Sequence, residues 1–217
     1  MELLLIEKIY KRILKESEAA NVEGLACYVR FGDEIEAAVY NIDGMREDLE
    51  KNPEFFTRKS HYGSNKALLK NMVGCVAIKP TDDPCWGAYE ISYIVGPGKI
   101  VYGLAYALSP NGMLISDRYA MSQSALKAWK NMSDKQTRGK RPLDNVRSPK
   151  TPGLEDDCEF RKEEYLNYAY ESEGWEKGML DGLRSAHENF VRNEVSISKK
   201  DFEEFVYLAG ITLFDLS

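Results

Sequence analysis

The order of apolar and polar residues predicts a helix and then a β-hairpin at the start of the chain. Apolar side chains between residues 6 and 14 recur three and four positions apart, which is typical of an amphipathic helix. Two runs rich in β-branched and aromatic residues, 25–31 and 35–42, then flank a turn formed by Gly32 and Asp33. We therefore expect an N-terminal helix followed by an antiparallel strand pair.

The middle of the chain predicts the centre of a mixed sheet. Residues 73–78 and 86–95 are apolar and rich in β-forming residues, and the loop of Pro and Asp residues between them favours a hairpin. Helix spacing follows at 101–108, then a short buried strand at 113–116, then a further helix capped by Ser122. Because a strand–helix–strand unit joins parallel strands through a right-handed crossover, we expect one parallel pair here.

The last third of the chain changes from an irregular to a helical pattern. Glycines and prolines give residues 133–157 the character of a long loop, and 158–170 has the spacing of a short helix. Near the C-terminus, Ser198 and Asp201 are placed as in a capping box, ahead of an apolar helical stripe. A helical end therefore follows a segment without regular structure.

Together these patterns predict an α/β (α+β) fold, in which helices flank a central mixed sheet and extend it at both ends of the chain. A chain of 217 residues with 43% hydrophobic residues is large enough to bury a substantial core. We expect one sheet-containing domain over residues 1–170, with residues 171–217 as a helical extension packed on the same domain.

Composition narrows the classes of protein to which the chain can belong. The formal net charge is -6, and no apolar run approaches the ~18 residues that a membrane span needs. These two properties predict no membrane contact. Only two histidines occur, so we expect no His-rich metal site and no metal cofactor. Scattered cysteines without a CxxC pair indicate reduced thiols in a cytoplasmic protein; they are Cys27, Cys75, Cys85 and Cys158.

Several short motifs between residues 73 and 170 resemble one acyltransferase family. They are Trp86-Gly87-Ala88-Tyr89-Glu90, Leu114-Ile115-Ser116-Asp117-Arg118, Ala125 with Trp129, and Asp156-Asp157-Cys158. With the order strand, strand, glycine loop, helix, strand, helix, they resemble the GNAT acetyltransferase superfamily and, more narrowly, small GNAT-like proteins encoded by bacteriophages. The resemblance implies a GNAT-like sheet, acetyl-CoA as donor, a small-molecule or protein amine as acceptor, and a location in the host cytoplasm.

The resemblance assigns the donor site to the turn after the second central strand. The implied contacts are Ile94, Val95, Gly96, Gly98, Lys99 and Gly103. A helix N-terminus points unpaired N–H groups and the positive end of its dipole at a diphosphate, and glycine lets the backbone approach closely. The usual family loop is Gln or Arg, two residues, Gly, any residue, and Gly or Ala; this chain departs from it, notably at Pro97. An ordinary strand-to-helix turn is the alternative interpretation.

Proton transfer in such a site points to the strand before the turn. Glu90 lies between apolar neighbours, and a carboxylate buried there has a raised pKa that suits a general base. Tyr93, or Tyr89, is the candidate acid. In a regular strand the two tyrosines share one face and Glu90 points to the other, so all three line one cleft only if a bulge intervenes. The alternative for Glu90 is a solvent-facing strand residue.

Candidate substrate contacts lie at two further places. Asp117 and Arg118 follow a strand at its carboxyl end, where open α/β sheets bind ligands, and Trp86 begins the central strand. The alternative is that the charged pair fixes the turn before the next helix. Cys158 could also form a nucleophilic dyad with His187, although the two neighbouring aspartates would raise its pKa.

The charges are unevenly distributed along the chain. Residues 127–150, the basic segment, carry eight Lys or Arg and two Asp, which makes this segment +6 and, against a total of -6, leaves -12 for the remainder. Such a segment is a candidate contact for a polyanion, either nucleic acid or the 3′-phosphate of CoA. A solvated loop balanced by neighbouring acids is the alternative.

The family resemblance and the charge pattern together suggest three functions. The first is an acetyltransferase that uses acetyl-CoA and an unidentified amine, with Glu90 or a tyrosine of the same strand managing protons. The second is a non-catalytic phage protein, a virion or nucleoprotein component, that keeps the fold and uses the basic segment as its contact. The third is a transferase that modifies a nucleobase, in which the basic segment holds DNA.

Overall fold

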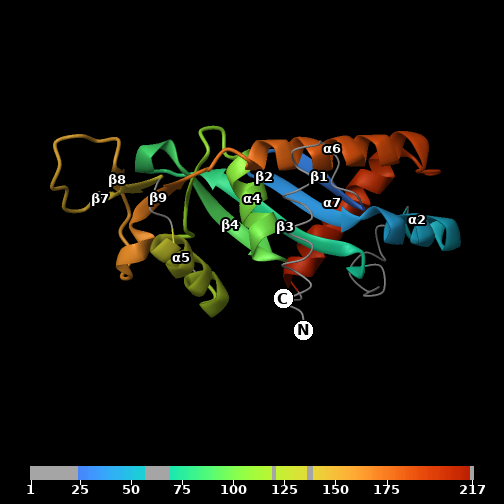
Figure 1. Cartoon of the computed structure of the whole chain (residues 1–217), viewed down its shortest axis with the longest axis horizontal. Helices are drawn as coiled ribbons and strands as arrows, with labels where there is room; N and C mark the ends of the chain where they lie inside the picture. The colour runs from blue at the N-terminus through green and yellow to red at the C-terminus, as the bar shows by residue number, and fades with distance from the viewer. Residues whose placement is uncertain (1–23, 57–68, 119–120, 136–138, 216–217) are drawn as a thin grey trace.

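A mixed sheet of seven strands forms the centre of the part of the chain that the structure describes (Figure 1). The computed structural model describes residues 24–56, 69–118, 121–135 and 139–215, so the helix expected at 6–14 lies outside the described residues. The strands follow the order β1-β2-β3-β4-β5-β9-β6. The chain is an α+β fold, as the sequence predicted.

Both predicted hairpins are present in the sheet. β1 (Leu25–Phe31) pairs with β2 (Ile35–Asn41), and β3 (Met72–Pro80) pairs with β4 (Tyr89–Val95), in each case antiparallel. β2 and β3 are also antiparallel neighbours. The two hairpins therefore form a continuous four-stranded half of the sheet that ends at β4.

The predicted strand–helix–strand unit supplies the parallel pair. α4 (Gly98–Leu108) follows β4, and β5 (Met113–Ile115) then lies parallel to β4. α5 (Gln123–Lys135) begins after the expected cap, because the Oγ of Ser122 accepts a hydrogen bond of 3.2 Å from the Ala125 N–H. Because β4 is the fourth of the seven strands, the turn between β4 and α4 follows a central strand of the sheet.

The prediction of a long loop at 133–157 is wrong in part, because short strands interrupt this segment. β6 (Lys140–Pro142) joins the edge of the main sheet. β7 (Asp144–Asn145) and β8 (Asp157–Cys158) form a small parallel pair of their own. Glycine and proline content indicated irregular structure, but it could not exclude strands of two or three residues that depend on distant partners.

The prediction of a helix at 158–170 is also wrong. The segment holds a 3₁₀ turn (Glu164–Leu166) and then the strand β9 (Tyr168–Glu171), which lies antiparallel between β5 and β6. A few apolar residues fit helical spacing and strand alternation equally well in so short a segment. Pairing with β5 and β6 decides in favour of the strand.

Helices cover both faces of the sheet (Figure 1). α4 and the first half of α6 (Glu176–Asn193) pack on the face to which Val39 of β2 points. α2 (Ile42–Lys51) and α7 (Lys199–Asp215) pack on the face to which the next residue, Tyr40, points. Alternation along β2 therefore separates two cores, one on each side of the sheet.

α7 begins at the predicted capping box. The Oγ of Ser198 accepts a hydrogen bond of 3.1 Å from the Asp201 N–H and donates one of 2.5 Å to the Asp201 carboxylate. Phe202 and Phe205 of this helix are buried against β2 and β3. The C-terminal helix is therefore part of the core rather than an appendage.

A disulfide between Cys85 and Cys158 corrects the expectation of four reduced thiols. Their Cα atoms are 4.9 Å apart, although 73 positions separate them in the chain. Both sulfurs lie in a third buried cluster that includes Ile115 of β5. Cys27 and Cys75 are free, buried thiols. Sequence spacing could not reveal this pair, because only the fold brings the turn before β4 against β8.

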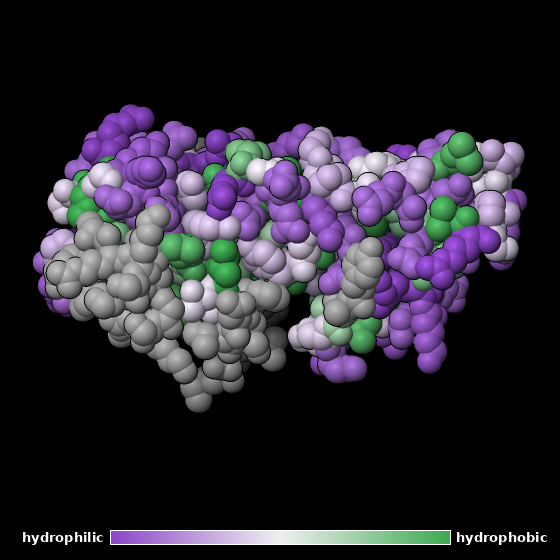
Figure 2. All heavy atoms as spheres, turned by 180° about the vertical axis from the view of Figure 1, so that it is seen from behind, coloured by the Kyte–Doolittle hydropathy of each residue, from purple (hydrophilic) through white to green (hydrophobic). Residues whose placement is uncertain are grey.

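The surface of the face seen in Figure 2 is mostly hydrophilic, and hydrophobic residues appear on it as small, separate patches. Four large apolar side chains are exposed in the part of the chain that the structure describes: Phe31, Val146, Leu154 and Phe160. None of the helices described has both the length and the apolar character to cross a membrane.

Candidate functional site

The parallel strands at the centre of the sheet separate after two residue pairs. Tyr89 lies opposite Leu114 and Glu90 opposite Ile115, and among the described residues no later part of β4 pairs with β5. β4 nevertheless continues, and residues 92–95 are partly exposed although β4 is an interior strand. Between Glu90 and the start of α4, the edge of β4 that faces β5 is therefore open. We call this open edge, which residues 92–95 form, the strand gap.

A β-bulge changes which side chains of β4 share a face. The partners of Glu90 and Tyr93 on β3 are Lys79 and Ala77, which are two residues apart and therefore point to the same face. The bulge makes this possible by inserting one extra residue, Ser92. Regular alternation would have placed Glu90 and Tyr93 on opposite faces. The structure thus brings the predicted base and acid to one face of the sheet.

Glu90 is a buried carboxylate at the beginning of the strand gap. It is 4% exposed, and its Oε1 accepts a hydrogen bond of 2.8 Å from the Arg118 N–H. Burial raises the pKa of Glu90, and the Arg118 hydrogen bond and the nearby charge of Lys79 only partly offset this effect. The solvent-facing alternative is therefore excluded, and the carboxylate has the raised pKa of a proton acceptor.

Tyr93 is held by a second carboxylate. Its hydroxyl donates a hydrogen bond of 3.2 Å to the Oε1 of Glu36 on β2. Burial, together with the charge of Glu36, raises the pKa of Tyr93 above its ordinary value. Tyr93 and Tyr207 of α7 line the same narrow space beneath that helix. A phenol with a raised pKa that already donates to a carboxylate is poorly suited to act as a general acid.

The N-terminus of α4 is exposed, and no side chain of the described residues caps it. Pro97 precedes the helix in an extended conformation, and its carbonyl accepts hydrogen bonds from the N–H groups of Ile100 and Val101. The first two residues of the helix, Gly98 and Lys99, are exposed. The positive end of the helix dipole therefore faces solvent beside the strand gap.

The glycines assigned to the donor site have different surroundings. At Gly96, with a φ of +123°, a Cβ would lie 2.8 Å from the Cα of Gly74, so close strand packing requires this glycine. At Gly98 a Cβ would meet only one side-chain atom within 4 Å, at 3.9 Å. At Gly103, one turn into α4, a Cβ would lie 3.0 Å from the Cε of Met179 on α6. Only Gly98 therefore leaves room for a ligand to approach the backbone.

Arg118 is a buried cation at the carboxyl end of β5. It is 5% exposed, its Nη1 donates a hydrogen bond of 2.9 Å to the Leu166 carbonyl, and its own carbonyl accepts one from Arg161. Its Nε and Nη2, and the Oγ of Ser116, are buried without a hydrogen-bond partner among the described residues. Asp117, between them, is partly buried. Buried polar atoms are nearly always hydrogen-bonded in native proteins, so the Nε and Nη2 of Arg118 and the Oγ of Ser116 require an explanation.

Trp86 has structural contacts at the start of β4. It lies in a 3₁₀ turn with a φ of +60°, and its Nε1 donates a hydrogen bond of 2.8 Å to the carbonyl of Pro142. The guanidinium of Arg141 lies 5.5 Å from the centre of its ring. These contacts hold Trp86 against β6 at the edge of the sheet, and its contact with a substrate stays a prediction.

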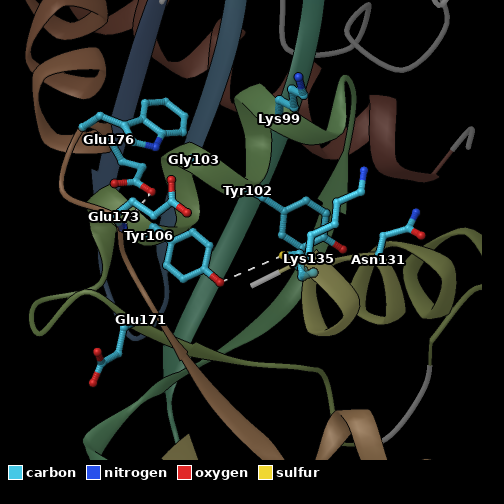
Figure 3. A pocket seen from close by; sticks show the side chains of 11 residues that line it. Lys99, Tyr102, Gly103, Tyr106, Asn131, Lys135, Glu171, Glu173 and Glu176 are labelled. Carbon is cyan, nitrogen blue, oxygen red and sulfur yellow. Dashed lines mark hydrogen bonds between the residues drawn. The ribbon is translucent and has the colours of Figure 1, made fainter. Parts of the chain in front are cut away.

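A cavity of about 290 Å³ lies between α4, α5 and the segment that enters α6 (Figure 3). On α4 the lining side chains recur three and four positions apart, on the stripe opposite the residues that pack on the sheet. Carboxylates, lysines and aromatic rings form its walls: Lys99, Tyr102, Gly103, Tyr106, Asn131, Met132, Lys135, Glu171, Glu173, Trp175 and Glu176. No single stretch of the sequence indicates this cavity, because three distant segments form it, and the recurrence of side chains along α4 is its local signal.

The basic segment is partly neutralised by acidic neighbours. Arg141 pairs with Glu171, and Arg147 pairs with Glu159 at 2.7 Å. The lysines of α5 are exposed, and Arg138 lies outside the described residues. For two of the eight basic residues, these pairs favour the interpretation of a solvated segment whose charge neighbouring acids balance. Contact of the segment with nucleic acid stays a prediction.

The disulfide excludes a nucleophilic dyad of Cys158 and His187, against which the two neighbouring aspartates already argued. The Nδ1 of His187 lies 2.9 Å from the Tyr40 hydroxyl, and its Nε2 lies 3.3 Å from the Glu203 carboxylate. Burial lowers the pKa of His187, although Glu203 opposes this effect. The imidazole therefore belongs to the core between α6 and α7.

The site contains no recognisable metal centre in the described ranges, where no group of three or more His, Cys, Asp or Glu side chains is placed to hold an ion.

No protein-family model matches the chain, and no curated protein or solved structure is significantly similar to it. A functional inference must therefore start from the strand gap and the residues around it.

Proposed function

We propose that this chain is a GNAT-like acyltransferase that transfers an acetyl group from acetyl-CoA to an amine. One observation carries the proposal: β4 and β5 separate beside an exposed helix N-terminus, and a buried carboxylate, Glu90, lies where they separate. In the superfamily that the sequence resembles, separated central strands form the slot for the pantetheine arm. The arrangement around β4 therefore supports an acyl-CoA site.

The residues around the strand gap fit the donor. The N–H groups at the start of α4 suit a diphosphate, because a helix N-terminus binds anions without a side-chain charge. Gly98 leaves room there, and Lys99 adds a positive charge. The backbone of Ile94 and Val95 lies along the open edge of β4, and Arg118 contributes buried donors that have no partner among the described residues. Acetyl-CoA supplies an activated acyl group when it is bound.

Glu90 is the residue that handles the proton of the acceptor. An amine attacks only in its neutral form, and a carboxylate whose pKa burial raises accepts the proton that the amine loses. The Arg118 N–H holds this carboxylate in one orientation. Tyr93 donates to Glu36 instead, so the role of general acid predicted for Tyr93 is not part of the proposal.

Binding and turnover of the full chain test the proposal. Calorimetry with acetyl-CoA should show binding, and a thiol assay should show CoA release that depends on an added amine. Glu90→Gln keeps an acceptor for the Arg118 N–H but removes the base, so we expect CoA release to fall about 100-fold with donor binding retained. Glu47→Gln, on the exposed side of α2, is the control. The proposal fails if the protein does not bind acetyl-CoA at millimolar concentration.

A further inference from the structure

The guanidinium of Arg118 is buried with only part of its hydrogen-bonding capacity in use. Nη1 donates to the carbonyl of Leu166, whereas Nε and Nη2 have no partner in the part of the chain that is described. Burying an ionised group without partners is costly in free energy, so it is rare unless the group has a function. These two atoms therefore remain available to a further hydrogen-bond acceptor.

The two unused atoms form one edge of the planar guanidinium. With Nη1 fixed by Leu166, the Nε and Nη2 edge presents two parallel N–H groups, which is the geometry that binds a carboxylate through two hydrogen bonds. Ser116, two residues earlier, provides a buried hydroxyl that also lacks a partner. Residues 116–118 thus hold three buried polar atoms without a partner among the described residues, and two of them form one edge of the guanidinium.

The backbone of Arg118 lies beside the proposed base. The Arg118 N–H donates to Glu90, and Arg161 donates to the Arg118 carbonyl, so the backbone on both sides of the side chain is fixed beside the proposed base. Burial lowers the pKa of Arg118 to about 10, and attraction to Glu90 partly opposes this decrease. A second anion at the free edge would stabilise the guanidinium in its charged form.

We propose that Arg118, assisted by Ser116, binds a carboxylate group carried by one of the two reactants. The inference rests on the proposed acyltransferase function and gives its substrate a chemical class. The carboxylate comes either from the acyl chain of a dicarboxylic acyl-CoA, such as succinyl-CoA, or from an amino-acid acceptor. In both cases a two-donor contact in a water-excluded site orients the reactant and rejects its neutral analogue.

The first experiment compares carboxylates with their amides and requires no acyl transfer. The wild-type protein is titrated with succinate and succinamide, and with glycine and glycinamide, at constant ionic strength. We expect at least one carboxylate to bind about tenfold or more tightly than its amide, because hydrogen bonds to a charged group are the stronger ones. Equal affinities within both pairs overturn the inference.

Turnover then identifies the source of the carboxylate. Preference for succinyl-CoA over acetyl-CoA assigns it to the donor, and preference for amino acids over their amides assigns it to the acceptor. Transfer from acetyl-CoA without either preference overturns this inference and leaves the proposed function intact. A carboxylate preference without any acyl-CoA binding overturns the proposed function instead.

Substitutions test whether Arg118 is responsible for the preference for carboxylates over amides. Arg118→Lys keeps a positive charge but loses the two-donor edge, so we expect the preference for carboxylate to decrease about tenfold. Arg147→Lys, at an exposed arginine paired with Glu159, is the matched control and should retain it. Circular dichroism checks that Arg118→Lys folds, and the wild-type comparison decides the question if it does not. A folded Arg118→Lys protein with an unchanged preference overturns the assignment.

Discussion

The N–H of Arg118 donates a hydrogen bond of 2.8 Å to the Oε1 of Glu90. The bond joins a residue that follows β5 to the last residue of β4 that pairs with β5. It therefore fixes the carboxylate at the point where the two strands separate. A general base depends on such positioning, because proton transfer requires a defined distance and orientation.

The first prediction concerns the pH dependence of stability. Burial raises the folded-state pKa of Glu90 above its ordinary value of 4.5, so the folded protein binds this proton more tightly than the unfolded chain. Ionisation of Glu90 therefore lowers the free energy of unfolding as the pH rises from about 4.5 through the folded-state pKa. Glu90→Gln should be more stable than wild type at pH 7, and the difference should vanish in acid.

Urea unfolding of both proteins between pH 4 and pH 8 measures this difference. A Glu90→Gln protein that is less stable than wild type at neutral pH would contradict the prediction, since it would mean that the ionised carboxylate stabilises the fold.

The second prediction concerns the N-terminus of α4. Gly98→Pro removes one N–H but keeps the helix, because proline is tolerated at the first helical position and Pro97 already has the extended conformation that a following proline requires. We expect the affinity for acetyl-CoA to fall about tenfold as a hydrogen bond to phosphate is lost. Gly98→Ala keeps the N–H, has room for its methyl group, and should bind like wild type. Calorimetry that finds both variants equal would argue against this diphosphate site.

The third prediction concerns the disulfide. Unfolded, unreduced protein should titrate two thiols, from Cys27 and Cys75, and reduction should raise the number to the four cysteines of the sequence. Removing both Cys85 and Cys158 by substitution with Ser should lower the free energy of unfolding by about 2–4 kcal/mol, because the bridge closes a long loop. This variant should not respond to dithiothreitol. Four thiols in the oxidised protein would show that the bridge does not form.

The fourth prediction concerns the packing of α4 on α6. A Cβ at Gly103 would lie 3.0 Å from Met179 and 3.1 Å from Trp175, so Gly103→Val should destabilise the protein by about 1–3 kcal/mol. Met179→Ala makes space beside the new side chain, and the double variant should therefore lose less than the sum of the two single changes. Thermal unfolding of the four proteins measures this coupling, and strict additivity would contradict it.

The local elements around the site can be predicted from the amino-acid sequence alone. The β-rich runs of β3 and β4, the Gly-Pro-Gly turn before α4 and the strand that follows are all encoded by residues close together in the chain. The parallel pairing of β4 and β5 follows from the helical crossover that joins them. Glu90 was recognisable as a candidate base because its strand neighbours are apolar.

Which of these residues come into contact depends on how distant segments pack in the fold. The extra residue Ser92 in β4, the insertion of β9 between β5 and β6, and the Cys85–Cys158 bond all depend on partners elsewhere in the chain. Periodicity within a short segment does not encode such partners, because the same alternation fits a paired strand, an open edge or one turn of helix. A charged residue after a strand likewise suggests exposure, and Arg118 is buried only because distant segments enclose it.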